Sequence, residues 1–240
     1  MVTRRFVGVG GMRLAYRVWG PPEGPPLVLL PALGEVSGDW ETVAAVLARG
    51  RRVYAVDLRG HGHSDWPGAY SLELMRADVL GFLDALGLDR IDLVGHSMGG
   101  IVAYLVASAR PGRVDRLVLE DIGAPYPRPA TTPERPDGDL PFDWAMVRAV
   151  RRQIDTPPTD WPAALGGITA RTLILAGGPR SHIPQESVNE LARLIPDTRL
   201  RTIPVGHLIH REAPEAFTEA VTEFLGGPAG RRARGLSGND

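Results

Sequence analysis

Short runs of consecutive apolar residues alternate along the chain with stretches in which apolar residues recur every three or four positions. The runs predict strands buried on both faces, and the periodic stretches predict amphipathic helices. The alternation favours a mostly parallel sheet with helices on both faces. The expected strands are residues 27–30, 52–56, 91–94, 117–119, 172–176 and 200–203. The expected helices are residues 40–48, 71–86, 101–108, 142–154, 186–194 and 214–225.

Two regions depart from this alternation. At the start, residues 6–9 and 12–18 flank Gly10-Gly11, which predicts an antiparallel hairpin at the sheet edge. Between residues 122 and 170 the pattern degrades into Pro, Asp, Thr and Gly with one plausible helix, so we interpret this stretch as a short cap inserted over the core. The core is then residues 1–121 and 171–225, and the polar, glycine-rich residues 226–240 are expected to form a disordered tail.

Composition narrows the class of protein. A chain of 240 residues with 43% hydrophobic content suits a single α/β domain. The 27 basic and 28 acidic residues nearly balance, which disfavours nucleic acid or an anionic membrane as partner and favours a small-molecule substrate. The absence of cysteine excludes disulfides, thiolate metal sites and a cysteine nucleophile. No signal-peptide or membrane-spanning run is present, so we expect a cytoplasmic protein; the oligomeric state cannot be read from the sequence.

The segment Gly95-His96-Ser97-Met98-Gly99 matches the Gly-x-Ser-x-Gly nucleophile elbow. The motif also occurs by chance in glycine-rich loops, but it then seldom follows a predicted strand and precedes a predicted helix, as it does here. A sharp turn at the serine leaves no room for a Cβ at the flanking glycines and exposes its Oγ at a helix N-terminus. The sequence therefore predicts Ser97 as a catalytic nucleophile.

With this elbow, residues 13–225 resemble the α/β-hydrolase fold, in particular its small esterases and lactonases. Residues 57–64, Asp-Leu-Arg-Gly-His-Gly-His-Ser, resemble the loop that follows the fourth strand of that fold. Gly206-His207, followed by His210 and Glu212-Ala213-Pro214, resembles the segment that carries the catalytic histidine. The resemblance implies hydrolysis of a small ester, thioester, lactone or amide through an acyl-enzyme, without a metal or organic cofactor. A serine at the elbow excludes the dehalogenase and epoxide-hydrolase branches, which need aspartate there.

The resemblance also assigns the base and the oxyanion donors. His207 follows a predicted strand and a glycine, and we assign it as the general base. The Met98 N–H is one expected oxyanion donor. The second is the Leu33 N–H by position, although this chain lacks the His-Gly that the family usually carries in that loop. Glu35 in the same loop either faces the pocket or is a solvated carboxylate.

The acidic member of the triad is displaced. Most relatives place it just after the seventh strand, where this chain has Arg180. A guanidinium is permanently charged and has no acceptor, so it cannot accept a hydrogen bond from an imidazole N–H. The sixth strand instead ends in Glu120-Asp121, at the carboxyl edge where active groups collect. Period-2 alternation sends these two side chains to opposite faces, and we choose Asp121 over Glu120 or over a triad without an acid.

Five side chains are candidates to line the pocket, with packing between cap and core as the alternative role: Leu33, Met98, Tyr126, Trp144 and Met146. Of these, Tyr126, Trp144 and Met146 are the expected substrate-binding residues. Two rival functions stay open at this point. One is a non-hydrolytic cyclase or lyase on the same fold, and the other is a ligand-binding protein with a degenerate triad, which Arg180 keeps in play.

Overall fold

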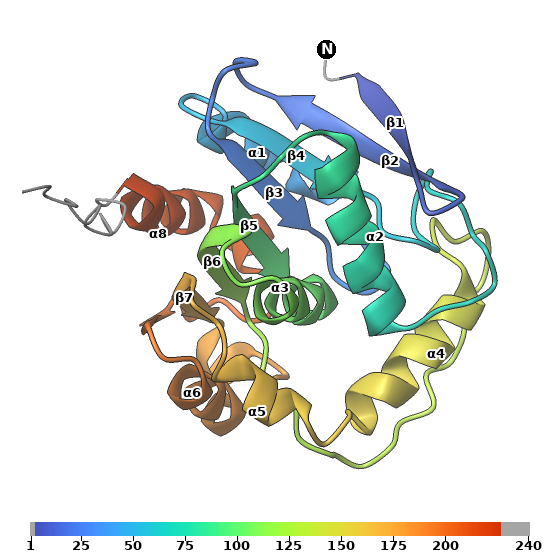
Figure 1. Ribbon diagram of the computed structural model, residues 1–240. Coiled ribbons are helices and arrows are strands. Elements are labelled where there is room, and N and C mark those ends of the chain that lie inside the picture. The colour runs from blue at the N-terminus through green and yellow to red at the C-terminus, as the bar shows by residue number, and fades with distance from the viewer. Residues whose placement is uncertain (1–2, 227–240) are drawn as a thin grey trace, which may run out of the picture.

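In the computed structural model, which describes residues 3–226, eight strands form one sheet in the order β1-β2-β4-β3-β5-β6-β7-β8 (Figure 1). The strands are β1 Arg4–Val9, β2 Met12–Trp19, β3 Pro26–Leu30, β4 Arg52–Val56, β5 Ile91–His96, β6 Val114–Glu120, β7 Arg171–Ala176 and β8 Thr198–Thr202. The α-helices are α1 Glu41–Leu47, α2 Leu72–Ala85, α3 Met98–Ala109, α4 Trp144–Asp155, α5 Trp161–Leu165, α6 Gln185–Leu194, α7 Ile209–Glu212 and α8 Pro214–Gly226. The 3-10 helices are η1 Ser37–Trp40 and η2 Gly178–Arg180.

Strand directions agree with the sequence pattern. β1 and β2 form the expected antiparallel hairpin at the sheet edge, and β2 also pairs antiparallel with β4. Every other pairing is parallel, from β4 through β3, β5, β6 and β7 to β8. The carboxyl ends of these parallel strands therefore meet at one edge of the sheet, which is where ligands bind in open α/β folds.

Two apolar layers cover the sheet. On one face, α2 and α3 pack against it in a cluster that also takes in side chains of α4, α5 and α6. On the other face, α1, α8 and Trp40 form the second cluster with the opposite sides of the same strands. β5 is buried along its whole length because both of its faces are covered, which fits its mostly apolar sequence.

The segment between β6 and β7 contains two helices, where the sequence predicted one. α4 lies beyond α2 in Figure 1, on the side of the molecule away from β7 and β8. The additional helix is the five-residue α5, which has a proline in its first turn and Gly166 at its C-cap. A pattern search misses so short a helix because it spans little more than one turn between breaker residues.

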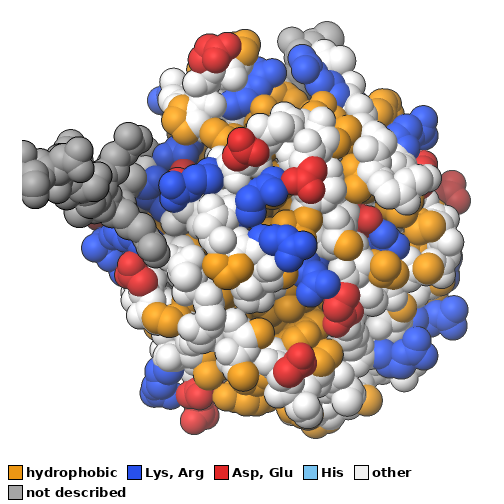
Figure 2. All heavy atoms as spheres, in the orientation of Figure 1, with side chains coloured by type: hydrophobic (Ala, Val, Ile, Leu, Met, Phe, Trp, Pro, Cys, Tyr) orange, Lys and Arg blue, Asp and Glu red, His pale blue; other side chains and the backbone are white. Residues whose placement is uncertain are grey.

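The surface gives no sign of a single charged partner. Figure 2 shows acidic and basic side chains interspersed with apolar ones over the face that carries α2 and α3. Across residues 3–226, no helix combines the length and the apolar character that crossing a bilayer requires. The expected tail, residues 226–240, lies outside the described residues except for Gly226, the last residue of α8.

Candidate active site

The chain makes a strained turn at Ser97. This residue links β5 to α3 with φ 50° and ψ −116°, a conformation that a residue with a side chain rarely adopts. A Cβ on Gly95 would lie 2.4 Å from the Gly99 carbonyl oxygen, and one on Gly99 would lie 2.4 Å from the carbonyl oxygens of Leu30 and Pro31. Both glycines are therefore required sterically. The turn leaves Ser97 partly exposed, ahead of the first helical N–H groups of α3.

Asp121 and His207 meet across the end of the sheet. His207 Nδ1 lies 2.7 Å from Asp121 Oδ2. Asp121 is fully buried, and its φ of 46° turns the chain out of β6, so that its side chain leaves the alternation of the strand. Glu120, one residue earlier, instead accepts hydrogen bonds from the His210 backbone N–H at 2.8 Å and from its Nδ1. The two neighbouring acids thus serve two different histidines.

Two further donors hold the Asp121 carboxylate. The Gly177 N–H donates to Oδ1 at 2.7 Å, and the Ser181 hydroxyl donates to Oδ2. Burial alone would raise the pKa of Asp121, but the hydrogen bonds from His207, Ser181 and Gly177 lower it below its ordinary value. The carboxylate is therefore ionised at neutral pH and accepts from the imidazole.

The loop after β7 supports this acid instead of providing one. Arg180, in the position where relatives carry their acid, is exposed to solvent. The same loop contributes Gly177 and Ser181, the two donors to Asp121. A Cβ at Gly177 would lie 2.2 Å from the Gly206 carbonyl oxygen, and the Gly206 N–H donates back to Gly177 O at 3.0 Å. This close approach of two loops fixes the backbone immediately before His207.

The loop after β3 leaves one backbone donor unused. The Ala32 N–H donates to Glu35 Oε2 at 3.2 Å, and the Gly34 N–H donates to His61 Nε2 at 3.2 Å. Between them, the Leu33 N–H has no acceptor among the residues that the structure describes, and the same holds for the Met98 N–H at the start of α3. Two unpaired donors thus border the cavity that contains Ser97.

The neutral imidazole of His61 holds the loop after β3 in place. Its Nε2 accepts from Gly34, and its Nδ1 lies 3.0 Å from the Arg59 carbonyl oxygen, to which it must donate. Burial lowers the pKa of His61 to about 4, which is consistent with the neutral ring that these two partners require.

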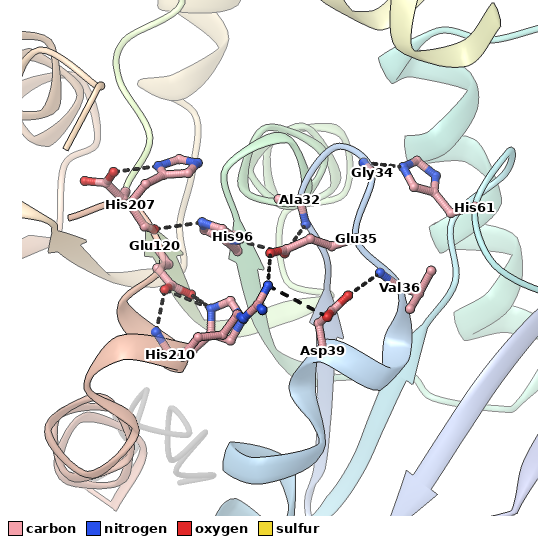
Figure 3. Close-up of polar contacts among 12 residues, drawn as sticks. Ala32, Gly34, Glu35, Val36, Asp39, His61, His96, Glu120, His207 and His210 are labelled. Atoms are coloured by element: carbon pink, nitrogen blue, oxygen red, sulfur yellow. Dashed lines mark hydrogen bonds and ion pairs between the residues drawn. The ribbon is translucent and has the colours of Figure 1, made fainter. Parts of the chain in front are cut away.

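Behind the site lies a buried ion pair that the sequence did not reveal. His96 Nδ1 lies 3.0 Å from Glu35 Oε2, and His96 Nε2 lies 2.9 Å from the His207 carbonyl oxygen (Figure 3). Burial alone would lower the pKa of His96, but the charges of Glu120 and Glu35 raise it to about 9. Burial would raise the pKa of Glu35, yet the hydrogen bond from His96 lowers it to about 2. A doubly protonated His96 therefore links the β3 loop to the backbone of His207.

His210 completes this buried group of side chains. Its ring stacks on Trp40 with centroids 4.3 Å apart, and its Nε2 has no hydrogen-bond partner among the described residues. Donor atoms of Glu35, His96 and His210 lie within 4.8 Å of one another, the one grouping among residues 3–226 that could hold a metal ion. Both nitrogens of His96 already have hydrogen-bond partners, so a metal there would first have to displace a proton.

The candidate catalytic residues border one cavity of about 460 Å³. Ser97, His207 and Asp121 line it, and so do Leu33 and Met98. Further lining side chains come from the segment after β6 and from the loop after β7; they include Tyr126, Arg128, Arg151, Ile154, Trp161, His182 and Ile183.

The three expected substrate-binding residues fall in different places. Tyr126 lines the cavity and is 45% exposed. Met146 is fully buried in the core, where its side chain contacts the region of Gly60, and Trp144 packs partly buried against the same core. Neither is among the residues that line the cavity, so the structure places both in the packing of α4 on the core.

The eight-stranded α/β core thus places a serine at a strained strand-to-helix turn and a paired carboxylate and histidine at one edge of its sheet. The chain belongs to the alpha/beta hydrolase fold family, whose model matches residues 25–156.

Individual relatives agree with this assignment. The chain is 30% identical to the mouse protein named sn-1-specific diacylglycerol lipase ABHD11, over 84% of this chain and 81% of that one. A solved hydrolase from Pseudomonas aeruginosa is 30% identical with a TM-score of 0.76 and covers 93% of this chain and 98% of its own. The enol-lactonase from Burkholderia xenovorans is 26% identical with a TM-score of 0.75, over 92% and 100%. These relatives support a hydrolase.

Proposed function

We propose that the protein is a serine hydrolase that cleaves a small ester, thioester, lactone or amide through an acyl-enzyme. The observation that carries the proposal is the 2.7 Å contact between Asp121 and His207 at the cavity that Ser97 also lines. In the sequence, Arg180 in the usual acid position had kept a decayed triad open. The ionised Asp121 carboxylate beside the His207 imidazole supports an intact acid–histidine pair over that alternative.

In the proposed reaction, Ser97 Oγ attacks the substrate carbonyl carbon while its proton passes to His207 Nε2. Asp121 accepts from Nδ1–H, which fixes the tautomer of His207 and stabilises the imidazolium that forms. The negative charge on the substrate oxygen is stabilised by the N–H groups of Leu33 and Met98. When the tetrahedral intermediate collapses, the leaving group departs with the proton from His207. Water then attacks the acyl-enzyme with His207 as base, and the acid product leaves.

The test uses two serines that share the cavity. Ser97→Ala should reduce the hydrolysis of p-nitrophenyl butyrate to background and should abolish covalent labelling by a fluorophosphonate, because the variant lacks the attacking oxygen. Ser187→Ala is the matched control, since Ser187 also lines the cavity but lies outside the elbow. It should keep both activity and labelling. Equal turnover by wild type and Ser97→Ala, or a label found on Ser187, would overturn the proposal.

A further inference from the structure

Two arginines line the cavity that contains Ser97 and His207. Arg128 comes from the loop after β6, and Arg151 comes from the last turns of α4. Their side chains are 37% and 33% exposed, so both can be reached by solvent or by a ligand. The proposed hydrolysis assigns neither of them a part.

These arginines are only partly neutralised inside the protein. Asp155 Oδ1 lies 2.6 Å from Arg128 Nε and 3.4 Å from Arg151 Nε, and Arg151 Nε also donates to Thr131 Oγ1 at 2.8 Å. Asp155 is 1% exposed and does not line the cavity. Arg128, Arg151 and Asp155 together carry a net charge of +1, and a ligand in the cavity can contact the two guanidinium groups but not the carboxylate.

The terminal nitrogens of both guanidinium groups are available. The hydrogen bonds that the two guanidinium groups donate within the protein use Nε. Among residues 3–226, none of their four Nη atoms has a hydrogen-bond acceptor. A guanidinium with its Nη edge unpaired matches the two oxygens of a carboxylate, which it can bind through two parallel N–H···O bonds.

His182 interacts both with the two arginines and with His207. The rings of His182 and His207 have centroids 4.2 Å apart. Burial lowers the pKa of His182, and the charges of His207, Arg151 and Arg128 lower it further. The arginines therefore act electrostatically on His182, whose ring contacts that of His207.

The cavity also has several apolar lining side chains. The side chains of Ile101, Ile122, Ile154, Trp161 and Ile183 line it. A substrate that fills this space would thus present a reactive carbonyl at Ser97, a short apolar spacer and a polar group at the arginines.

We propose that Arg128 and Arg151 select substrates in which a carboxylate lies remote from the scissile ester, such as monoesters of dicarboxylic acids. This inference rests on the proposed hydrolase function and names its substrate class. A single carboxylate matches the net charge of +1 at this end of the cavity, whereas a phosphate dianion would leave excess negative charge.

The experiment compares esters that differ in one charge. Mono-p-nitrophenyl adipate and pimelate, which carry the carboxylate on the acyl side, are compared with their neutral methyl p-nitrophenyl diesters. A third pair, 6-butyryloxyhexanoate and its methyl ester, carries the carboxylate on the alcohol side. In the wild type, kcat/KM should favour the anionic member of at least one pair by about tenfold or more. The Arg128→Gln/Arg151→Gln double variant should bring that ratio to about one, mostly through KM, because the contact is remote from the reacting atoms.

Arg152→Gln is the matched control, since Arg152 lies beside Arg151 on α4 but is exposed and does not line the cavity. It should keep the wild-type ratio and the activity on the neutral esters. Because the arginines also contact the buried Asp155, the double variant is judged by its ratio of anionic to neutral ester, which a smaller amount of active protein does not change. No preference for any anionic ester in the wild type, or a preference that survives in the double variant, would overturn the proposal.

Failure here and failure of the proposed function can be told apart. If no ester of either kind is cleaved, the hydrolase proposal fails, and binding of monomethyl adipate measured by calorimetry still tests the arginines. Binding that is lost in the double variant and kept in Arg152→Gln supports the carboxylate site. Equal binding by all three proteins, or none by the wild type, contradicts it.

Discussion

Asp121 acquires its role from a local change of backbone direction. A residue that continued β6 in regular alternation would point to the face of the sheet opposite Glu120. The positive φ of Asp121 releases it from that pattern and turns its carboxylate to His207, while Glu120 stays with His210. Two adjacent acids therefore have separate functions, one proposed to be chemical and the other structural.

The variant Asp121→Asn tests this division. An amide can no longer hold His207 in the productive tautomer, so kcat should fall by about 10³- to 10⁴-fold while the melting temperature changes little. The matched variant is Glu120→Gln, which should lower the melting temperature because it weakens the buried contact with His210, and should keep most of kcat. Steady-state kinetics and thermal unfolding on both proteins decide the question. If Glu120→Gln is the one that loses turnover, the two acids have been assigned the wrong way round.

At the scale of elements, the buried pair of Glu35 and His96 joins three separate pieces of chain. Glu35 lies in the loop after β3, His96 ends β5, and the His207 carbonyl oxygen belongs to the loop after β8. A charged ring at this junction connects the loop after β3, the end of β5 and the backbone of His207.

This junction should make stability depend on pH. The pKa of His96 is raised to about 9 from 6.5, so its contribution is complete below about pH 6.5 and is lost as the pH rises toward 9. The pKa of Glu35 is lowered to about 2 from 4.5, so its contribution is complete above about pH 4.5 and is lost as the pH falls toward 2. Between about pH 4.5 and pH 6.5 both contributions are complete.

The measurement is the melting temperature of wild type and His96→Gln from pH 6 to pH 9.5. The wild type should lose on the order of 5 °C over this range in excess of the variant, which has no imidazole to deprotonate. His63→Gln is the control, because His63 is an exposed histidine and should follow the wild-type curve. Parallel curves for wild type and His96→Gln would show that His96 is not charged in the folded protein.

How much of these elements could be foreseen depends on the range of the contacts that define them. The elbow is a local pattern, and β5, Ser97 and α3 lie where the sequence placed them. The position of Asp121 followed from the rule that strand ends share one edge. The pair of Glu35 and His96 joins residues 61 positions apart and leaves no periodic signal, so nothing in the sequence linked them. Trp144 and Met146 have pocket-like composition, but α4 turns them toward the core.

At the scale of the whole molecule, the segment between β6 and β7 packs on the core through apolar side chains of α4 and α5 and is further held by a few polar contacts. Asp155 at the end of α4 accepts from Arg128, from the Thr131 N–H at 3.0 Å and from the Thr131 hydroxyl at 3.1 Å. Gln153 donates to Glu73 of α2, and the Leu72 N–H donates to Gln153. The irregular chain before α4 thus depends on one buried carboxylate.

Asp155→Asn should therefore loosen this segment before the core. We expect proteinase K to cut the variant between residues 124 and 143 about tenfold faster than the wild type, because local opening requires less free energy than global unfolding. Mass spectrometry of the first fragments locates the cuts. Asp137→Asn is the control, since Asp137 lies exposed in the same segment and should leave the cleavage rate unchanged. First cuts within the β-sheet core would show that the segment is no weaker than the rest.

The placement of the acid at the end of β6 has a consequence for how the protein could be altered. In the proposed reaction the nucleophile and the acid follow the adjacent strands β5 and β6, so the turn after β7 needs no ionisable side chain of its own. Gly177 and Ser181 have to be kept because they donate to Asp121, whereas Pro179 and Arg180 are exposed and can be exchanged. A new recognition loop could therefore be grafted at these two positions without changing Ser97, His207 or Asp121.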